Sequence, residues 1–332
     1  MQRKEIEKAL KAVKPGVASK DIVESMTYFF LTGTHIISYN DKISIQHPLK
    51  TGIKAFVKAE ALMRVVFACT AMEMDMVMKE DTLNIKAKRL NVKLATIEDP
   101  EFLTRTDLIA KSLKKAKWKP LPNNFMDSIE LCSFVAASME SEYTLSCVKV
   151  EGKDCVASDN QRIAMATLDS EMDLMYLKAN EVKHITAIQP AYYYIAKAWV
   201  HFKSEDDCIF SIRKVDGSFP DFSQFVKFKG DKVSLPKTIL EGTEIASIFS
   251  DTDKPLIDVT ISEGACIVSV KSVGGSSKFK SKIKYKGPDL KFTINPDFLS
   301  EMMKHSTDLI IAKDKIRLTT ENFTLVTSLV DE

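Results

Sequence analysis

The feature that most constrains the fold of this chain is a helix-then-strands order that recurs along its whole length. Some segments place apolar residues at helical spacing, and the segments after them alternate apolar and polar residues as half-buried strands do. Helices are expected near Ile6–Val13, Lys58–Cys69, Phe125–Ala137, Asn180–Ile188, Pro236–Phe249 and Pro296–His305. Strands are expected at Tyr28–Ser38, Lys42–Ile45, Met74–Met78, Thr82–Ala87, Leu90–Leu94, Tyr143–Val150, Cys155–Ala166, Tyr192–Lys197, Trp199–Phe202, Cys208–Lys214, Leu256–Ile261, Ala265–Val270, Lys278–Lys286, Asp308–Ala312, Lys315–Thr319 and Phe323–Leu329. This order predicts an α+β protein with antiparallel sheets.

The length of the chain favours three domains. Its 332 residues exceed what one core usually holds, and a third of the chain has an ordinary domain size. Prolines disfavour both helix interiors and central strands, so boundaries are expected at the basic segment 112–122 and between Pro220 and Gly230. The predicted domains are 1–117, 118–229 and 230–332, each made of two helix-then-strands halves.

Composition predicts a fully folded protein of a reducing compartment. The hydrophobic content is 45%, and 11 Gly and 11 Pro are too few for a disordered chain. The first residues form a charged amphipathic pattern without the apolar core of a signal peptide, and no apolar run is long enough to cross a membrane. The six cysteines are scattered without a C-x-x-C pair, as reduced packing residues are. We expect a cytoplasmic protein.

Positive charge is concentrated in the first third. The net charge of +2 is too small to indicate a nucleic-acid-binding protein by itself. Residues 1–117, however, carry 21 Lys and Arg against 14 Asp and Glu, whereas the middle and last thirds have net charges of −4 and −1. The first third is therefore the part expected to meet a polyanion.

No catalytic, cofactor or metal motif is present. Phosphate-binding glycine loops, zinc-protease helices and nucleophile elbows are absent, and the five histidines are dispersed. The acidic run Glu205–Asp207 lies between two expected strands, where a solvated hairpin turn is a better interpretation than a metal site. The sequence predicts a protein that is not an enzyme and binds no cofactor.

Three further patterns have two interpretations each. Lys4, Lys8 and Lys11 recur on the face of the first helix opposite Ile6, either as a solvated face or as a contact to nucleic acid. Five lysines alternate along Lys278–Lys286, where protection of a sheet edge is favoured over a phosphate-binding face. Tyr192–Tyr194 could stack on bases, but neighbouring strand residues face opposite sides, so packing is favoured.

One segment carries a specific resemblance. Val215-Asp216-Gly217-Ser218-Phe219-Pro220-Asp221-Phe222 resembles the strand and turn that end the middle domain of bacterial DNA polymerase beta-subunit sliding clamps. The glycine would permit the turn, Phe219 would anchor it, and Pro220 would end the ladder.

Further similarity surrounds this segment. Ser158-Asp159-Asn160-Gln161-Arg162-Ile163-Ala164 is similar to the Thr-Asp-Gly-His-Arg-Leu-Ala of the same family, and it follows Phe134–Ser138 and Glu142–Leu145, which also fit. Phe292–Leu299 resembles a strand and helix start of the last domain. The resemblance spans all three thirds and is strongest in the middle one.

The resemblance implies a DNA clamp: three similar domains per chain, sheets outside and helices lining the inner face of a head-to-tail homodimeric ring around double-stranded DNA. Contact would be independent of base sequence, and the ring would tether the replicative polymerase for processive synthesis. Helix position selects as DNA-facing residues Lys4, Lys8, Lys11, Lys58, Arg64, Lys183 and Lys304.

The resemblance also implies a pocket for short peptides of the DNA polymerase and of the clamp-loader ATPase. By motif match it would include Leu145, Ser158, Asn160, Gln161, Arg162 and Ile163, with Val326 and Leu329 from the C-terminal segment. We expect an apolar groove bordered by Arg162, suited to hydrophobic anchors.

Departures from the family pattern leave an alternative open. Asn160 replaces a glycine, Gln161 replaces a histidine, and the family's usual ending is missing. These changes bear on peptide preference, and the short chain suggests a divergent clamp that is phage-encoded. The alternative is a clamp-like scaffold or competitor that binds replication proteins without encircling DNA.

Overall fold

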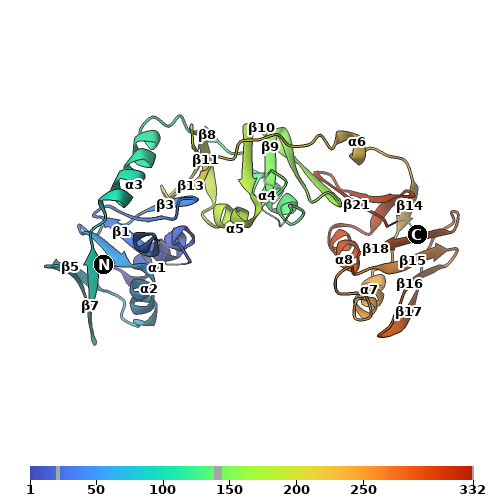
Figure 1. Cartoon of the computed structure of the whole chain (residues 1–332), viewed down its shortest axis with the longest axis horizontal. Helices are drawn as coiled ribbons and strands as arrows, with labels where there is room; N and C mark the ends of the chain where they lie inside the picture. Colours follow the sequence, from blue (N-terminus) through green and yellow to red (C-terminus); the bar gives the residue numbers. More distant parts are fainter. Residues whose placement is uncertain (20–22, 138–143, 331–332) are drawn as a thin grey trace. The chain divides into compact units, whose positions relative to one another are not determined.

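The structure, a computed structural model, describes residues 1–19, 23–137 and 144–330. Ser138, Glu142 and Tyr143 of the resemblance, and the last two residues Asp331 and Glu332, lie outside the described residues. The described chain divides into two compact units, residues 1–126 with 180–216 and residues 127–179 with 217–332 (Figure 1).

The first unit is built on one antiparallel sheet. Eleven strands follow the order β5-β6-β7-β4-β1-β2-β3-β13-β12-β11-β8. Its helices are α1 (Arg3–Val13), η1 (Lys14–Gly16), η2 (Glu24–Thr27), α2 (Ala59–Ala68), α3 (Pro100–Leu113) and most of α5 (Ala179–Ala187). Its strands are β1 (Tyr28–Thr32), β2 (His35–Tyr39), β3 (Ile43–Pro48), β4 (Lys54–Lys58), β5 (Asp75–Lys79), β6 (Thr82–Ala87), β7 (Leu90–Ile97), β8 (Lys119–Pro120), β11 (Pro190–Ile195), β12 (Trp199–Ser204) and β13 (Ile209–Arg213).

Both faces of this sheet are covered near β1 and β2. The Ser38 hydroxyl donates to the carbonyl of Val13 at the end of α1, so this face lies against the helices α1 and α2. The neighbouring Tyr39 points to the other face, where its ring meets Phe102 of α3 edge to face. Two buried faces explain why the run Tyr28–Leu31 is apolar at every position rather than alternating.

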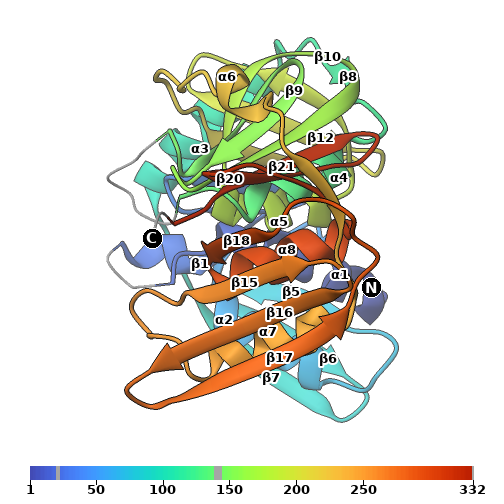
Figure 2. The same cartoon turned by 90° about the vertical axis from the view of Figure 1, so that its right-hand side faces the viewer.

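The second unit contains two antiparallel sheets. Their orders are β14-β19-β20-β21-β10-β9 and β17-β16-β15-β18. The strands are β9 (Cys147–Ser158), β10 (Arg162–Lys178), β14 (Asp231–Ser234), β15 (Ile257–Ser262), β16 (Ala265–Ser272), β17 (Gly275–Lys282), β18 (Leu290–Ile294), β19 (Asp308–Ile311), β20 (Lys315–Thr319) and β21 (Phe323–Ser328). The helices are most of α4 (Phe125–Ser133), α6 (Ser223–Val226), α7 (Ile239–Ser247) and α8 (Pro296–His305). Figure 2 shows strands β15–β18 in front of α7 and α8.

The α+β class with antiparallel sheets is confirmed, and the six expected helices are present. The strands of the middle third are shared between the units, because β13 pairs with β3 and β10 pairs with β21. Division into domains 1–117, 118–229 and 230–332 stays a prediction.

Some expectations about local structure are wrong. Tyr28–Ser38 is not one strand, because Thr32 ends β1 and His35 begins β2, which pairs with β1 as an antiparallel neighbour. Cys155–Ala166 is not one strand, because Ser158 ends β9 and Arg162 begins β10, with Asn160 in the left-handed region at φ 68° between them. Helix α3 was not expected, although Asp99 caps it by accepting from the amides of Glu101 and Phe102, and Pro100 occupies its first turn.

Candidate functional site

Helix α1 presents the basic face that its sequence predicts. Ile6, Leu10 and Val13 are fully buried, and Lys4, Lys8 and Lys11 are exposed on the opposite side. Lys8 donates to Asp206 of the β12–β13 turn at 2.5 Å, which lowers the pKa of that carboxyl to about 2. The run Glu205–Asp207 lies in a hairpin turn, as expected, and Asp206 forms an ion pair with Lys8 of the helix.

The other predicted DNA-facing residues differ in their surroundings. Lys58 is not on the second helix: it ends β4, and its ammonium lies 2.7 Å from the Thr27 hydroxyl and over the Tyr28 ring. Arg64 and Lys304 are exposed but pair with Glu60 and Glu301 of their own helices, whereas Lys183 is exposed on α5. Among the predicted DNA-facing residues, the largest group of exposed cations on one helix face is therefore Lys4, Lys8 and Lys11 of α1.

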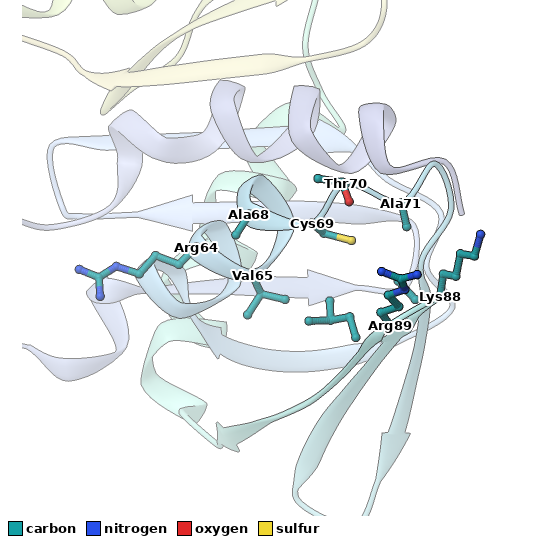
Figure 3. A pocket seen from close by; sticks show the side chains of 10 residues that line it. Arg64, Val65, Ala68, Cys69, Thr70, Ala71, Lys88 and Arg89 are labelled. Carbon is teal, nitrogen blue, oxygen red and sulfur yellow. The ribbon is translucent and has the colours of Figure 1, made fainter.

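Arg64 also lines a cavity of about 620 Å³ beside the end of α2. Val65, Ala68 and Leu90 form its apolar part, and Lys88 and Arg89 lie at its far side. Figure 3 shows the Arg64 side chain pointing away from Lys88 and Arg89. Because the three cations do not converge, the cavity is not arranged to hold a single anion.

The turn between β9 and β10 brings the motif Ser158–Ile163 together. The Ser158 hydroxyl donates to the carbonyl of Arg162 at 2.7 Å and accepts from the amide of Asn160 at 3.2 Å. Asn160 adopts the left-handed conformation, which glycine adopts readily and asparagine is among the few other residues to tolerate. The Gln161 carbonyl accepts from the amide of Ser328, which ties the turn to the C-terminal strand.

Arg162 lies on the opposite face of the sheet from Ile163. Its guanidinium forms two hydrogen bonds with Asp159, at 2.9 and 2.7 Å, and lies 4.2 Å from the ring centre of Phe298 on α8. Ile163 instead pairs with Val326 and packs with Val226. Strand alternation thus separates the expected border residue from the expected apolar residues.

An apolar cluster forms around Ile163 on that face. We call it the apolar patch, and it consists of Val156, Ile163, Met165, Phe222, Val226, Phe228 and Val326. Cations flank it, because the guanidinium of Arg317 and the ammonium of Lys315 lie 5.0 and 5.1 Å from the Phe228 ring centre. Arg317 pairs with Val326 across β20 and β21, so it shares the face of Ile163.

Only part of this patch was predicted from the sequence. Ile163 and Val326 lie in it, whereas Leu145 and Leu329 are buried without belonging to the cluster. Phe222, Phe228 and Arg317 were missed as site residues. Phe222 lies in the Val215–Phe222 segment that carries the resemblance. Arg317 alternates with the buried Ile316 and Leu318, and this pattern could have placed Arg317 on the less buried face of the strand.

The turn after β13 fits the role that the sequence predicts. Gly217 has φ 157°, a conformation that other residues rarely adopt, and an added Cβ atom would lie 2.7 Å from a methyl group of Thr144, so both backbone and space favour glycine. Phe219 anchors the turn by stacking on Tyr176, with ring centres 6.3 Å apart. Phe222 then reaches the apolar patch.

Residues 1–19, 23–137 and 144–330 contain neither a candidate metal site nor a candidate membrane-spanning helix. No three His, Cys, Asp or Glu side chains are grouped so that they could hold a metal ion. No helix in this part of the chain is long and apolar enough to cross a membrane. Five of the six free cysteines are buried, as expected for packing residues.

Comparison with known proteins identifies the fold. Over its whole length the chain is similar to a DNA polymerase sliding clamp from Pseudomonas aeruginosa, with a TM-score of 0.84, 16% identity and 99% of that chain covered. The DNA polymerase III beta chain of Streptococcus pneumoniae gives a TM-score of 0.86 at 16% identity, and the beta subunit of Thermotoga maritima gives 0.85 at 15%, each with 98% of that chain covered. No protein-family model and no curated protein matches the chain. The chain therefore has the sliding-clamp fold.

Proposed function

We propose that this protein is a DNA sliding clamp, a non-enzymatic ring that encircles duplex DNA and tethers the replicative polymerase. The observation that carries the proposal is the likeness to beta-subunit clamps over the full length of both chains. A match over the whole length of the chain, rather than over one domain, supports a function that depends on the whole architecture. The chain would act in the cytoplasm on double-stranded DNA without reading its base sequence.

The exposed stripe of Lys4, Lys8 and Lys11 supplies the DNA contact in this proposal. Phosphate contacts from lysine are independent of base sequence and individually weak, so they permit sliding. Retention would come from closure: copies joined head to tail through unlike surfaces form a ring when the rotation closes, and we propose a dimer. A closed ring cannot leave a duplex sideways.

Retention on circular and linearised DNA tests this proposal. The protein is loaded with the clamp loader of its own replication system onto nicked circular plasmid, and the bound fraction is measured by gel filtration before and after one restriction cut. We expect retention on the circle and loss after the cut, because only a topological link is lost through a free end. Equal retention on both forms would refute encirclement.

Partner peptides would bind at the apolar patch. A peptide of the polymerase or of the clamp-loader ATPase could place hydrophobic anchors against Phe222 and Phe228 and an acidic group near Arg317. Arg162 is already paired with Asp159 and would act by holding the turn rather than by touching the peptide.

Substitution of Phe228 with alanine should weaken binding of a labelled polymerase-derived peptide by about 5-fold or more, since removal of an aromatic anchor costs at least about 1 kcal/mol. Fluorescence anisotropy measures this affinity. Phe298→Ala is the matched control, because the same truncation is made beside Arg162 on the opposite face of the sheet. A larger loss in the control would move the peptide site to that face.

A scaffold or competitor that binds replication proteins without encircling DNA is the second candidate. The acid partners of Lys8, Arg64 and Lys304 favour it, since paired cations attract DNA less strongly. Such a protein would remain a monomer in sedimentation at all concentrations and would show no difference between circular and linear DNA, while still binding the peptide.

A further inference from the structure

The outer face of the four-stranded sheet carries lysines that the proposed function does not use. Paired residues form rows across the sheet, such as Lys278 with Ser269 and Asp258, and Lys280 with Ile267 and Thr260. The other face of the same strands holds the buried core, where Phe279 lies against Gly242 of α7. The lysines, which alternate with Phe279 along β17, therefore lie on the face of the sheet away from α7, and Figure 2 shows β15, β16 and β17 in front of that helix.

This face is basic and weakly compensated. Lys278, Lys280 and Lys282 are exposed, and none of the three forms an ion pair with a described residue. Asp258 is the acidic residue in the rows, and its carboxylate accepts a hydrogen bond from the Thr293 hydroxyl at 2.7 Å. Lys271 of the neighbouring strand β16 adds a further exposed positive charge.

Protection of a sheet edge accounts for only part of this arrangement. β17 is an edge strand, so lysines on it would discourage pairing with another chain. Lys271, however, lies on the inner strand β16, and Lys284 and Lys286 continue the exposed alternation after the ladder has ended at Lys282. The charges of Lys271, Lys284 and Lys286 therefore do not prevent another strand from pairing with the free edge of β17.

We propose that this lysine row binds the phosphate backbone of single-stranded nucleic acid. Alternate residues of a strand are about 6.8 Å apart, comparable with the spacing of successive phosphates in an extended single strand. A flexible single strand can follow such a straight row, whereas the phosphates of a duplex turn away from it. The site uses none of the residues assigned to duplex contact and does not require ring closure.

The surroundings of the lysines favour nucleic acid over an acidic protein. Protein interfaces are centred on buried aromatic or aliphatic anchors, and the neighbours here are Ser269, Thr260 and Ser262, with Ile267 as the one large apolar side chain in these rows. The same rows have no aromatic ring on which a base could stack. Binding is therefore electrostatic, independent of base sequence and strongly salt-dependent.

The test uses the full chain and a labelled oligothymidylate, titrated by fluorescence anisotropy over a range of NaCl concentrations. The variant Lys278→Gln/Lys280→Gln/Lys282→Gln should lower the affinity roughly 100-fold at about 0.1 M salt and reduce the salt slope by about 2, because each single-strand phosphate contributes about 0.7. Replacement of the same residues with arginine should preserve the affinity. Lys79→Gln/Lys86→Gln/Lys93→Gln, three exposed strand lysines of the first unit, is the matched control and should change it little.

Several outcomes would overturn the proposal. One is an unchanged salt slope in the glutamine variant, and another is an equal loss of oligothymidylate affinity in the control variant. A third is tighter binding of a polyglutamate peptide of matched charge, which would indicate an acidic protein partner. Aggregation of the glutamine variant with unchanged oligothymidylate affinity would assign the lysines to edge protection. Retention of the glutamine variant on circular DNA should equal that of the wild type, so this test and that of the proposed ring can fail separately.

Discussion

Replacement of Lys4, Lys8 and Lys11 with glutamine is expected to lower the affinity for a short linear duplex roughly 100- to 500-fold at about 0.1 M salt, if each contacts one phosphate. All three side chains are exposed on one face of α1, and the buried face with Ile6 and Leu10 is untouched, so the fold should remain. The salt slope should decrease by 2 to 3, since each duplex phosphate contributes about 0.9. Of the three, Lys8 should contribute least, because it already shares its charge with Asp206.

The triple variant Lys79→Gln/Lys86→Gln/Lys93→Gln is again the matched control. It removes the same charge from exposed positions on β5, β6 and β7 of the same unit. Anisotropy titrations of both variants against one duplex separate a local contact from an effect of net charge. Equal losses in the two variants would contradict the assignment of α1 as the DNA-facing helix.

The stability of the first unit is expected to fall by roughly 3 kcal/mol between pH 7 and pH 4 because of His201. This side chain is fully buried, with its Nδ1 atom 2.7 Å from the Ser211 hydroxyl and its ring stacked on Tyr194. Burial lowers the pKa of His201 from 6.5 to about 4. Between pH 6.5 and 4 the histidine is protonated in the unfolded chain but stays neutral in the folded chain. The free energy of unfolding is therefore highest above pH 6.5 and decreases as the pH falls toward 4.

Urea unfolding followed by tryptophan fluorescence measures this effect selectively. Trp118 and Trp199 are the two tryptophans of the chain, and both belong to the first unit. His201→Phe keeps an aromatic ring beside Tyr194 but cannot be protonated, so its stability should depend much less on pH between 6.5 and 4. His184→Gln, at a partly exposed position on α5, should leave most of the dependence in place. A pH dependence unchanged in His201→Phe would exclude His201 as its source.

Much of the secondary structure was predictable, because helix caps and apolar periodicity depend on residues that are close together in the sequence. Helix α8 begins and ends where proline and histidine predict, with Asn295 capping it. The alternation on Lys278–Lys286 correctly separated exposed lysines from the buried Ile283 and Tyr285. Helix α3 was not predicted, because its apolar stripe is narrow, although Asp99 and Pro100 form a typical helix start.

The candidate site was less predictable, because it depends on which side of a sheet each residue faces. Motif matching joined Arg162 and Ile163 as neighbours in sequence, but neighbours in a strand point to opposite faces. Arg317 is distant in sequence from Ile163 and becomes its neighbour only through the ladders of β20, β21 and β10. No local pattern records that adjacency.

By itself the sequence determined the α+β class, most helices, the basic stripe on α1 and the turn at Gly217, all of which depend on residues close together in the chain. Only the tertiary structure decided that Lys58 ends a strand and that Lys8 forms an ion pair with Asp206. It also decided that Arg317, rather than Arg162, borders the apolar patch. The physical reason is that periodicity and turn chemistry are local. Strand pairing and ion pairs between distant segments depend on the register in which those segments meet.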